Sequence, residues 1–180
     1  MIGPSFGRVV QRAVAGDAIA FDELYRSYAG RVRGFAAARG SEDPDAIAND
    51  VMLSVFQNID GFRGDETAFV RWMFTIARNR LIDAHRSRTR RPVLADADVP
   101  DNPEPSAEML AFDNLSLDQV QEWLALLTVE QREVIALRLV EDLSIADVAE
   151  IVGRPVTAVK ALQRRGLRRL ERIILEEGVS

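Results

Sequence analysis

The amino-acid sequence predicts an all-α fold, made of two small helical domains that are joined by an extended acidic linker. Apolar side chains recur at three- and four-residue steps through most of the chain, and no stretch of strand length alternates apolar and polar residues. Between the two helical regions lies a segment with four prolines and no basic residue, which cannot bury enough apolar area to fold. The predicted boundaries are 1–91 for the first domain, 92–114 for the linker and 115–180 for the second domain.

Three helices are predicted in the first domain. Asp17 is suited to cap the first of them, because its carboxylate can accept hydrogen bonds from the free N–H groups of a helix start. The apolar stripe of this helix consists of Phe21, Leu24, Tyr25, Tyr28, Val32 and Phe35. A second helix, over 45–59, has the stripe Ile47, Val51, Val55 and Ile59, with Leu53 and Phe56 beside it. A turn with Gly61 and Gly64 then precedes a third helix, whose stripe is Phe69, Trp72, Met73, Ile76 and Ala77.

The second domain contains the pattern of a helix-turn-helix. Thr128 and Gln131 have the spacing of a capping box, and the following apolar residues are Val134, Ile135, Leu137 and Leu139. Ser144 and Asp147 form a second such pair, which opens a short helix that Gly153 is suited to end. The last helix carries Val159, Leu162, Gly166, Leu170, Ile173 and Ile174 on one side. Polar and basic residues occupy the other side, as in a helix that enters the major groove of DNA.

The distribution of charge favours a nucleic-acid partner more than the total charge does. The net charge of −5 argues against such a partner, but residues 61–92 carry 8 basic and 3 acidic side chains, and 153–180 carry 7 and 3. Residues 93–130 carry 9 acidic side chains and no basic one. Arginine supplies 22 of the 23 basic residues, and its planar guanidinium suits phosphate recognition. Solvated helix faces are the alternative interpretation of these charge blocks.

Several classes of function are not supported by the composition. The chain has no Cys, which excludes disulfides, thiolate metal sites and cysteine nucleophiles. His85 is the only histidine, and neither a second metal ligand nor a nucleophile is placed around it by a recognisable spacing. No Gly-rich phosphate loop is present. We therefore expect no enzyme activity, no metal and no cofactor, and the lack of a long apolar run or a signal peptide predicts a cytoplasmic protein without membrane insertion.

Two stretches carry motifs that resemble those of a known family. The first, 43–91, contains FRGD followed by a tryptophan and IARNRxxDxxR. The second, 127–170, contains QREVxxLRxxExLSxADVAEIxG followed by VK and a basic helix. In this order they resemble regions two and four of the extracytoplasmic-function (ECF) class of bacterial RNA polymerase sigma factors. The resemblance implies a promoter-specificity subunit that binds core RNA polymerase and promoter DNA, both double- and single-stranded. It also implies regulation by an anti-sigma factor.

The resemblance also implies roles for individual residues. Those implied to bind core polymerase are Asp45, Asn49, Asp50, Leu53 and Phe56. Those implied to recognise and melt the minus-ten element are Phe62, Arg63, Gly64, Asp65, Trp72, Arg78, Asn79, Arg80 and Arg86. Those implied to contact the minus-thirty-five element are Arg154, Thr157, Lys160, Ala161, Arg164, Arg165 and Arg168. Aromatic rings beside cationic side chains suit single-stranded DNA, because bases stack on the rings and the backbone follows the positive charge. For Phe69 and Met73 a place in the core is the better interpretation, and Trp72 suits both.

The resemblance also implies a role for the acidic linker. In the family the linker runs through the active-site cleft and the RNA exit channel, so Asp96, Asp98, Asp101 and Glu104 are expected to occupy a space shaped for nucleic acid until RNA displaces them.

One alternative function is a sigma-like decoy that sequesters an anti-sigma factor without binding DNA. Another is a helix-turn-helix regulator that never contacts polymerase. A decoy has no reason to keep cationic DNA faces, and an ordinary repressor has no need of the first domain.

Overall fold

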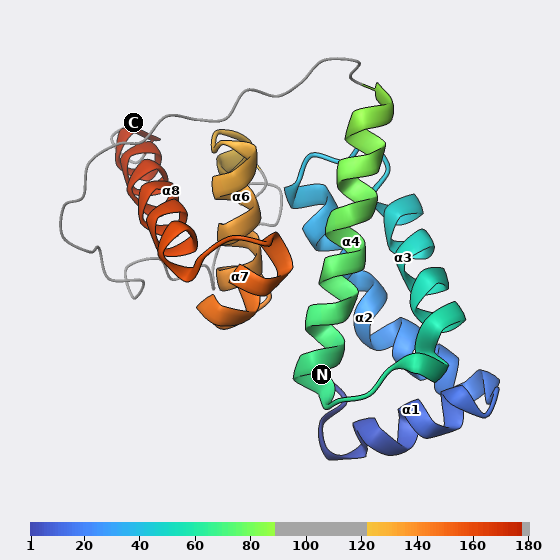
Figure 1. The fold of residues 1–180 in the computed structure, drawn as a ribbon. Helices are drawn as coiled ribbons and strands as arrows, with labels where there is room; N and C mark the ends of the chain where they lie inside the picture. The colour runs from blue at the N-terminus through green and yellow to red at the C-terminus, as the bar shows by residue number, and fades with distance from the viewer. Residues whose placement is uncertain (89–121, 178–180) are drawn as a thin grey trace.

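The computed structural model describes residues 1–88 and 122–177, and within this part of the chain every regular element is a helix (Figure 1). The prediction of an all-α fold is confirmed. The predicted linker, 92–114, lies outside the described residues, and so do Asp96, Asp98, Asp101 and Glu104. We refer to the helices before it as the N-terminal module and to those after it as the C-terminal module. The two modules lie side by side, with α7 of the second against α4 of the first (Figure 1).

The N-terminal module is a helical bundle. Its elements are η1 (Gly3–Ser5), α1 (Phe6–Val14), α2 (Ala18–Ala38), α3 (Pro44–Asn58), η2 (Ile59–Gly61) and α4 (Glu66–Arg88). Helix α3 packs against α2 and α4, and α1 packs across α2. The largest side chains that are fully buried in this bundle are Tyr28, Phe35, Phe69, Phe74, Leu24, Met52 and Met73.

Helix starts in this module follow the predicted physical chemistry. The carboxylate of Asp17 accepts hydrogen bonds from the N–H groups of Ile19 and Ala20, at 2.8 and 3.4 Å, and thus caps α2 as predicted. Asp43 caps α3 in the same way, and Pro44 fills the first helical position, where a missing N–H costs nothing.

Two parts of the sequence prediction for this module need correction. Helix α1 was not predicted, although Phe6, Val9, Val10 and Ala13 are buried at three- and four-residue steps. Tyr25 was assigned to the inward stripe of α2, but it is 39% exposed and donates a hydrogen bond from its hydroxyl to Asn49 Oδ1 at 2.6 Å. A phenol can occupy the edge of a stripe in this way, because its ring packs while its hydroxyl reaches a polar partner.

The C-terminal module contains the predicted helix-turn-helix. Its elements are α6 (Val129–Ile135), the π-helix η4 (Ala136–Val140), α7 (Ile145–Val152) and α8 (Val156–Glu177). Both predicted capping boxes are formed, at Thr128 and at Ser144. Gly153 ends α7 in the left-handed conformation, with φ +66°, where a Cβ would be strained.

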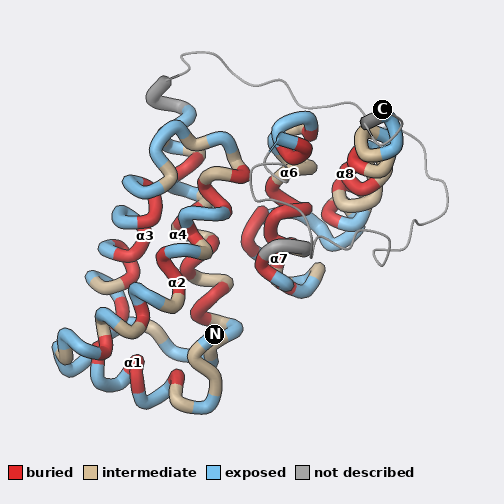
Figure 2. Tube along the Cα trace, turned by 180° about the vertical axis from the view of Figure 1, so that it is seen from behind, coloured by how far each residue is buried: buried red, intermediate tan, exposed pale blue. Residues whose placement is uncertain are grey.

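Burial divides α8 into two sides as predicted (Figure 2). The buried side contains Val159, Leu162, Gly166, Leu167 and Leu170, of which Leu167 was not predicted. At Gly166 the helix comes so close to α6 that a Cβ would meet Ile135 Cγ1 at 3.0 Å. The packing of α8 on α6 thus presents the opposite, basic side of α8 away from the core.

Candidate nucleic-acid and polymerase interfaces

The outer side of α8 is the first candidate interface. Thr157 and Lys160 are exposed, whereas Ala161, Arg164, Arg165 and Arg168 are half-buried. All six therefore lie at the surface of the second helix of a helix-turn-helix, which is the element that reads base edges in the major groove. Arg154, in the turn before α8, is exposed and forms an ion pair with Glu130 of α6.

The loop before α4 is the second candidate interface. The ring of Phe62 stacks on that of Trp72, with centroids 5.4 Å apart and planes 17° apart, and both rings are half-buried. Arg63 folds back, and its Nη1 donates to the carbonyl oxygens of Asp60 and Phe62 at 2.7 Å each. Gly64 has φ +148°, and a Cβ there would lie 2.8 Å from Ala68 Cβ. The two rings expected to stack on bases thus stack on each other in this structure.

Asp65 and Glu66 fix the beginning of α4 and its neighbours. Asp65 Oδ1 accepts a hydrogen bond from the N–H of Ala68 at 2.8 Å, which caps the helix. Glu66 accepts three hydrogen bonds, from the N–H groups of Ile2 and Gly3 at 2.7 and 2.8 Å and from the Tyr28 hydroxyl at 2.6 Å. Glu66 therefore ties the N-terminus and α2 to α4 directly beside the loop 62–65, which together with Trp72 we call the aromatic loop.

The hydrogen bond between Tyr28 and Glu66 contributes to a change in the pKa values of these two side chains. Burial by itself would raise the pKa of Glu66, but the hydrogen bonds from Tyr28 and from the two backbone N–H groups outweigh it, so the pKa lies below its ordinary value. Burial, followed by the hydrogen bond to the Glu66 carboxylate, raises the pKa of the Tyr28 hydroxyl far above its ordinary value. The pair therefore stays a neutral phenol that donates to a carboxylate, and Glu66 was not singled out from the sequence.

The predicted minus-ten residues of α4 do not share one environment. Arg78 is half-buried, and its Nε lies 3.1 Å from Glu133 Oε1 of α6. Asn79 and Arg80 are exposed, and Arg80 Nη2 donates to Ser54 Oγ of α3 at 2.8 Å. Arg86 lies in α4, with its side chain outside the described part of the structure. The structure thus places Arg78 against the C-terminal module and Arg80 against α3.

The candidate polymerase surface is one side of α3. Asp45, Asn49 and Leu53 are exposed, with Leu53 at 55%, and Phe56 packs its ring 4.9 Å from that of Phe21. At about 100° per residue these four positions fall within an arc of about 80°. Asp50 is exposed but lies about 60° beyond this arc. This side of α3 thus presents one exposed leucine among acidic and amide side chains.

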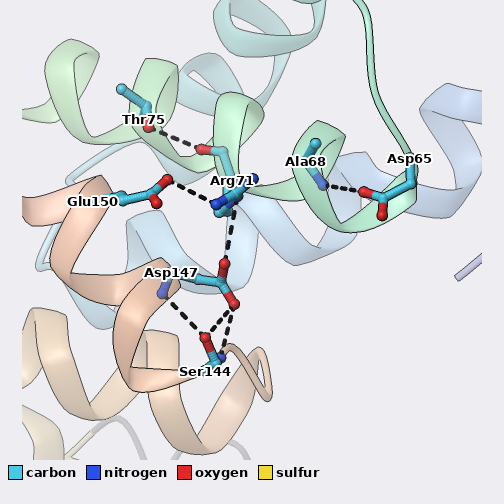
Figure 3. A network of polar contacts seen from close by, with 7 residues as sticks. All are labelled: Asp65, Ala68, Arg71, Thr75, Ser144, Asp147 and Glu150. Atoms are coloured by element: carbon cyan, nitrogen blue, oxygen red, sulfur yellow. Dashed lines mark hydrogen bonds and ion pairs between the residues drawn. The ribbon is translucent and has the colours of Figure 1, made fainter.

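The boundary between the two modules contains a polar network that the sequence analysis did not predict. In Figure 3, Arg71 of α4 points toward the start of α7, where its Nη1 donates to Glu150 Oε2 at 2.8 Å and its Nε lies 3.4 Å from Asp147 Oδ1. Asp147 at the same time caps α7 through Ser144. In the sequence, the only sign of this network is the acidic composition of residues 130–150. That composition does not show which arginines the carboxylates contact.

The described residues contain neither a metal-binding cluster nor a helix that could cross a membrane. Across 1–88 and 122–177 there is no cluster of three His, Asp or Glu side chains that is suited to hold a metal ion. In the same ranges, no helix combines the length and the apolar character that crossing a membrane requires.

Comparisons with known proteins agree with both regions of the resemblance. Residues 24–91 match the family described as Sigma-70 region 2, and 117–170 match the family described as Sigma-70, region 4. The chain is 33% identical over 171 residues to the ECF RNA polymerase sigma factor SigM of Mycobacterium tuberculosis, a match that covers 93% of this chain and 84% of SigM. It is 30% identical over 173 residues to the ECF RNA polymerase sigma factor BldN of Streptomyces coelicolor, covering 94% of this chain and 66% of BldN.

Among solved structures, the fold is similar to that of a sigma factor in a complex. The structure of the sigma factor RpoE with the anti-sigma factor NepR from Bartonella quintana matches with a TM-score of 0.66 and 22% identity. The match covers 86% of this chain and 96% of that one. At this identity the likeness concerns the fold.

Proposed function

The chain belongs to the family of ECF RNA polymerase sigma factors, and from this premise we propose that it binds core RNA polymerase and directs it to start transcription at specific promoters. One observation carries the proposal above the others. A helix-turn-helix whose second helix has a basic outer side occurs in the same chain as a region-two bundle in which α3 exposes Leu53 beside acidic side chains. A repressor needs only the first of these features, and a decoy needs only the second.

The minus-thirty-five element is read by α8 as duplex DNA. The exposed Lys160 and the neighbouring Arg164 and Arg168 supply cationic donors for phosphates and for guanine edges. Gly153 keeps α7 and α8 at the angle of a helix-turn-helix, so that α8 enters the groove while α7 crosses the backbone.

The minus-ten element is read by the aromatic loop and the arginines of α4 as single-stranded DNA. Extruding a base from the duplex costs a few kcal/mol, and stacking on an aromatic ring returns about 1–3 kcal/mol per base. Phe62 and Trp72 stack on each other in the structure, so a base stacks either on an outer face of this pair or in place of one ring. Recognition and strand separation are then one process, since the binding energy is available only from the opened strand.

Core polymerase docks on the side of α3 that contains Leu53. A large apolar side chain that is 55% exposed gains hydrophobic energy when a partner covers it. The acidic neighbours Asp45 and Asp50 select a basic partner surface. An anti-sigma factor is a further partner of this protein, as in the solved complex of RpoE with NepR.

Run-off transcription with purified core polymerase on a library of genomic promoters tests the proposal. We expect Leu53→Asp to weaken assembly with core polymerase by at least about 30-fold, the effect of losing one central interface residue. Ile19→Asp is the matched control, because Ile19 is 70% exposed on α2 and lies outside the docking side. If the chain assembles with core polymerase but the assembly starts RNA no more selectively than core alone, the proposed function is wrong. Binding of an anti-sigma factor without any assembly with polymerase would favour a decoy.

A further inference from the structure

Ser54 is a polar residue at a buried position of α3. It is 9% exposed, and the buried residues closest to it in the helix are Val51, Met52 and Val55. An alanine would fill nearly the same space and is a better helix former, so the Ser54 hydroxyl contributes to the molecule only through its hydrogen bonds. The proposed function assigns this hydroxyl no role.

The Ser54 hydroxyl has a partner on each of two helices. Ser54 Oγ donates to the carbonyl oxygen of Asp50 at 2.9 Å, one turn earlier in α3. The same Oγ accepts a hydrogen bond from Arg80 Nη2 of α4 at 2.8 Å. Asn58 Nδ2 donates to the carbonyl oxygen of Ser54 at 2.7 Å and so fixes the backbone of the residue as well. The hydroxyl is therefore held in one orientation, and it joins α3 to one guanidinium of α4.

This bond orders a side chain that is otherwise exposed. A long side chain at a surface samples many rotamers, and ordering it when a ligand binds costs free energy. The bond to Ser54 orders Arg80 before any ligand is present. It engages one of the five N–H groups of the guanidinium, and a bidentate contact with a phosphate requires only two.

The partner of Arg80 is also neutral, which distinguishes it from Arg78. The Nε of Arg78 lies 3.1 Å from a carboxylate oxygen of Glu133, so that a phosphate would have to compete with a negative charge. A serine hydroxyl fixes the guanidinium of Arg80 without neutralising it. Arg80 thus combines a fixed orientation with a full positive charge.

The place of Arg80 on α4 suits the backbone of a strand whose base is stacked at the aromatic loop. Arg80 comes eight residues after Trp72, which at 1.5 Å per residue is about 12 Å along the helix axis. Single-stranded DNA is bound by stacking of bases on aromatic rings together with cationic side chains that follow the backbone. Arg80 therefore lies farther along the path that a captured strand takes over α4.

We propose that Ser54 is a positioning residue for the minus-ten element: its hydroxyl holds the Arg80 guanidinium in the orientation in which it binds the backbone of the opened strand. The inference rests on the proposed function, since Arg80 needs a strand to bind. It gives α3 two roles on adjacent residues. Leu53 is exposed toward a partner, and Ser54 is turned toward α4.

Binding of a single-stranded minus-ten oligonucleotide by the holoenzyme tests the proposal. We expect Ser54→Ala to weaken this binding about 3- to 10-fold, the range expected when one long side chain has to be ordered on binding. The dependence of log K on log salt should stay the same, because Arg80 is still present and still reaches its phosphate. Arg80→Ala should instead lower both the affinity and the salt dependence.

Thr75→Val is the matched control, because it removes a hydroxyl that makes the same kind of bond within a helix. Thr75 Oγ1 donates to the carbonyl oxygen of Arg71 one turn earlier, at 2.9 Å, and among the described contacts it accepts no bond from a guanidinium. This variant should leave oligonucleotide binding unchanged. Binding of a minus-thirty-five duplex should be the same in Ser54→Ala and in the unchanged chain, and thermal unfolding of each full-length variant shows that the fold is kept.

A double-mutant cycle separates positioning from a general effect on the fold. Without the guanidinium there is nothing to position, so adding Ser54→Ala to Arg80→Ala should weaken oligonucleotide binding by less than about 2-fold. An equal loss with and without Arg80 would overturn the proposal, because the hydroxyl would then act through the fold.

The remaining outcomes are also decisive. Tighter binding by Ser54→Ala would overturn the proposal, since the bond would then hold Arg80 away from the strand. Unchanged binding by Ser54→Ala would overturn it while leaving the proposed function intact. If the holoenzyme with the unchanged chain bound no minus-ten oligonucleotide at all, the proposed function would fail, and the positioning role of Ser54 would fail with it.

Discussion

Glu66 shows how much one carboxylate can organise. It accepts hydrogen bonds from two backbone N–H groups of the N-terminus and from the Tyr28 hydroxyl, and it begins α4 next to the Phe62–Trp72 stack. Each of these bonds has a charged acceptor, and such bonds contribute more than neutral ones. We therefore expect the position of the aromatic loop to depend on the ionisation of Glu66, which is not among the residues assigned to DNA.

Replacing Glu66 by Gln tests this role through its pH dependence. The amide nitrogen cannot accept from the N–H of Gly3, so we expect the free energy of unfolding at pH 7 to fall by about 1–3 kcal/mol. Because the folded-state pKa of Glu66 is lowered, its contribution is fully present above the ordinary value of 4.5 and is lost as the pH falls through the folded-state pKa. The difference between Glu66→Gln and the unchanged chain should therefore shrink in acid.

Urea unfolding at pH 7 and at about pH 3.5 measures this difference. Glu176→Gln, at an exposed position of α8, is the control and should change stability by less than about 0.5 kcal/mol at either pH. A difference for Glu66→Gln that stays constant between the two pH values would show that the carboxylate charge is not what stabilises the fold.

At the scale of single residues, the sequence predicted which side chains are buried better than it predicted which side chains they contact. Periodicity placed Phe69 and Met73 in the core correctly. It could not show that Trp72 stacks on Phe62, because the loop between them determines that contact and a loop has no period. Tyr25 was misplaced for a related reason: its spacing fits the apolar stripe, while its hydroxyl has a partner 24 residues away on another helix.

Elements were predicted most accurately where local chemistry specifies them. The caps at Asp17, Thr128 and Ser144, and the left-handed Gly153, depend on side chains within a few residues, which a sequence displays directly. Helix α1 was missed because it has only nine residues, so its apolar pattern covers little more than two turns. The crossing of α8 over α6 at Gly166 was not predicted either, because the contact joins residues far apart in the chain.

Gly166 gives a test of that crossing. A Leu side chain at Gly166 would have to enter the space of Ile135, and we expect Gly166→Leu to lower the free energy of unfolding by about 1–3 kcal/mol. Gly30→Leu is the matched control, since Gly30 lies within α2 and a Cβ there meets nothing within 4 Å. That change should stabilise α2 by up to about 1 kcal/mol, because glycine is a poor helix former. Thermal unfolding of both variants measures the contrast, and equal effects would mean that the close approach of α8 to α6 does not matter.

At the scale of the whole molecule, the charge blocks have a second meaning that the sequence did not show. The acidic residues Glu133, Glu141 and Glu150 are more than solvated charges, because they form ion pairs with arginines of the other module. Composition gives the sign and the approximate place of each block along the chain. It cannot give the partner of each charge, since that depends on how the two modules pack against each other.

The proposed function assigns duplex DNA to the C-terminal module and single-stranded DNA to the N-terminal module. This assignment predicts how salt affects promoter binding by the holoenzyme. Each phosphate contact that is lost lowers the dependence of log K on log salt by about 0.9 for duplex DNA and by about 0.7 for a single strand. Lys160→Ala should therefore lower the slope by about 0.9 for a minus-thirty-five duplex and leave it unchanged for a minus-ten oligonucleotide. Arg80→Ala should do the reverse, with a decrease of about 0.7 for the oligonucleotide.

Titration of both DNAs into the holoenzyme at several salt concentrations checks these slopes, and Arg8→Ala, an exposed charge on α1, is the control for a general loss of charge. The holoenzyme is the right species, because the proposed function assigns promoter binding to the assembly with core polymerase. If Lys160→Ala and Arg80→Ala each changed both slopes equally, the two surfaces would share one DNA site. The chain would then bind promoters as a single cationic body, and the separation of duplex reading from strand capture would have to be abandoned.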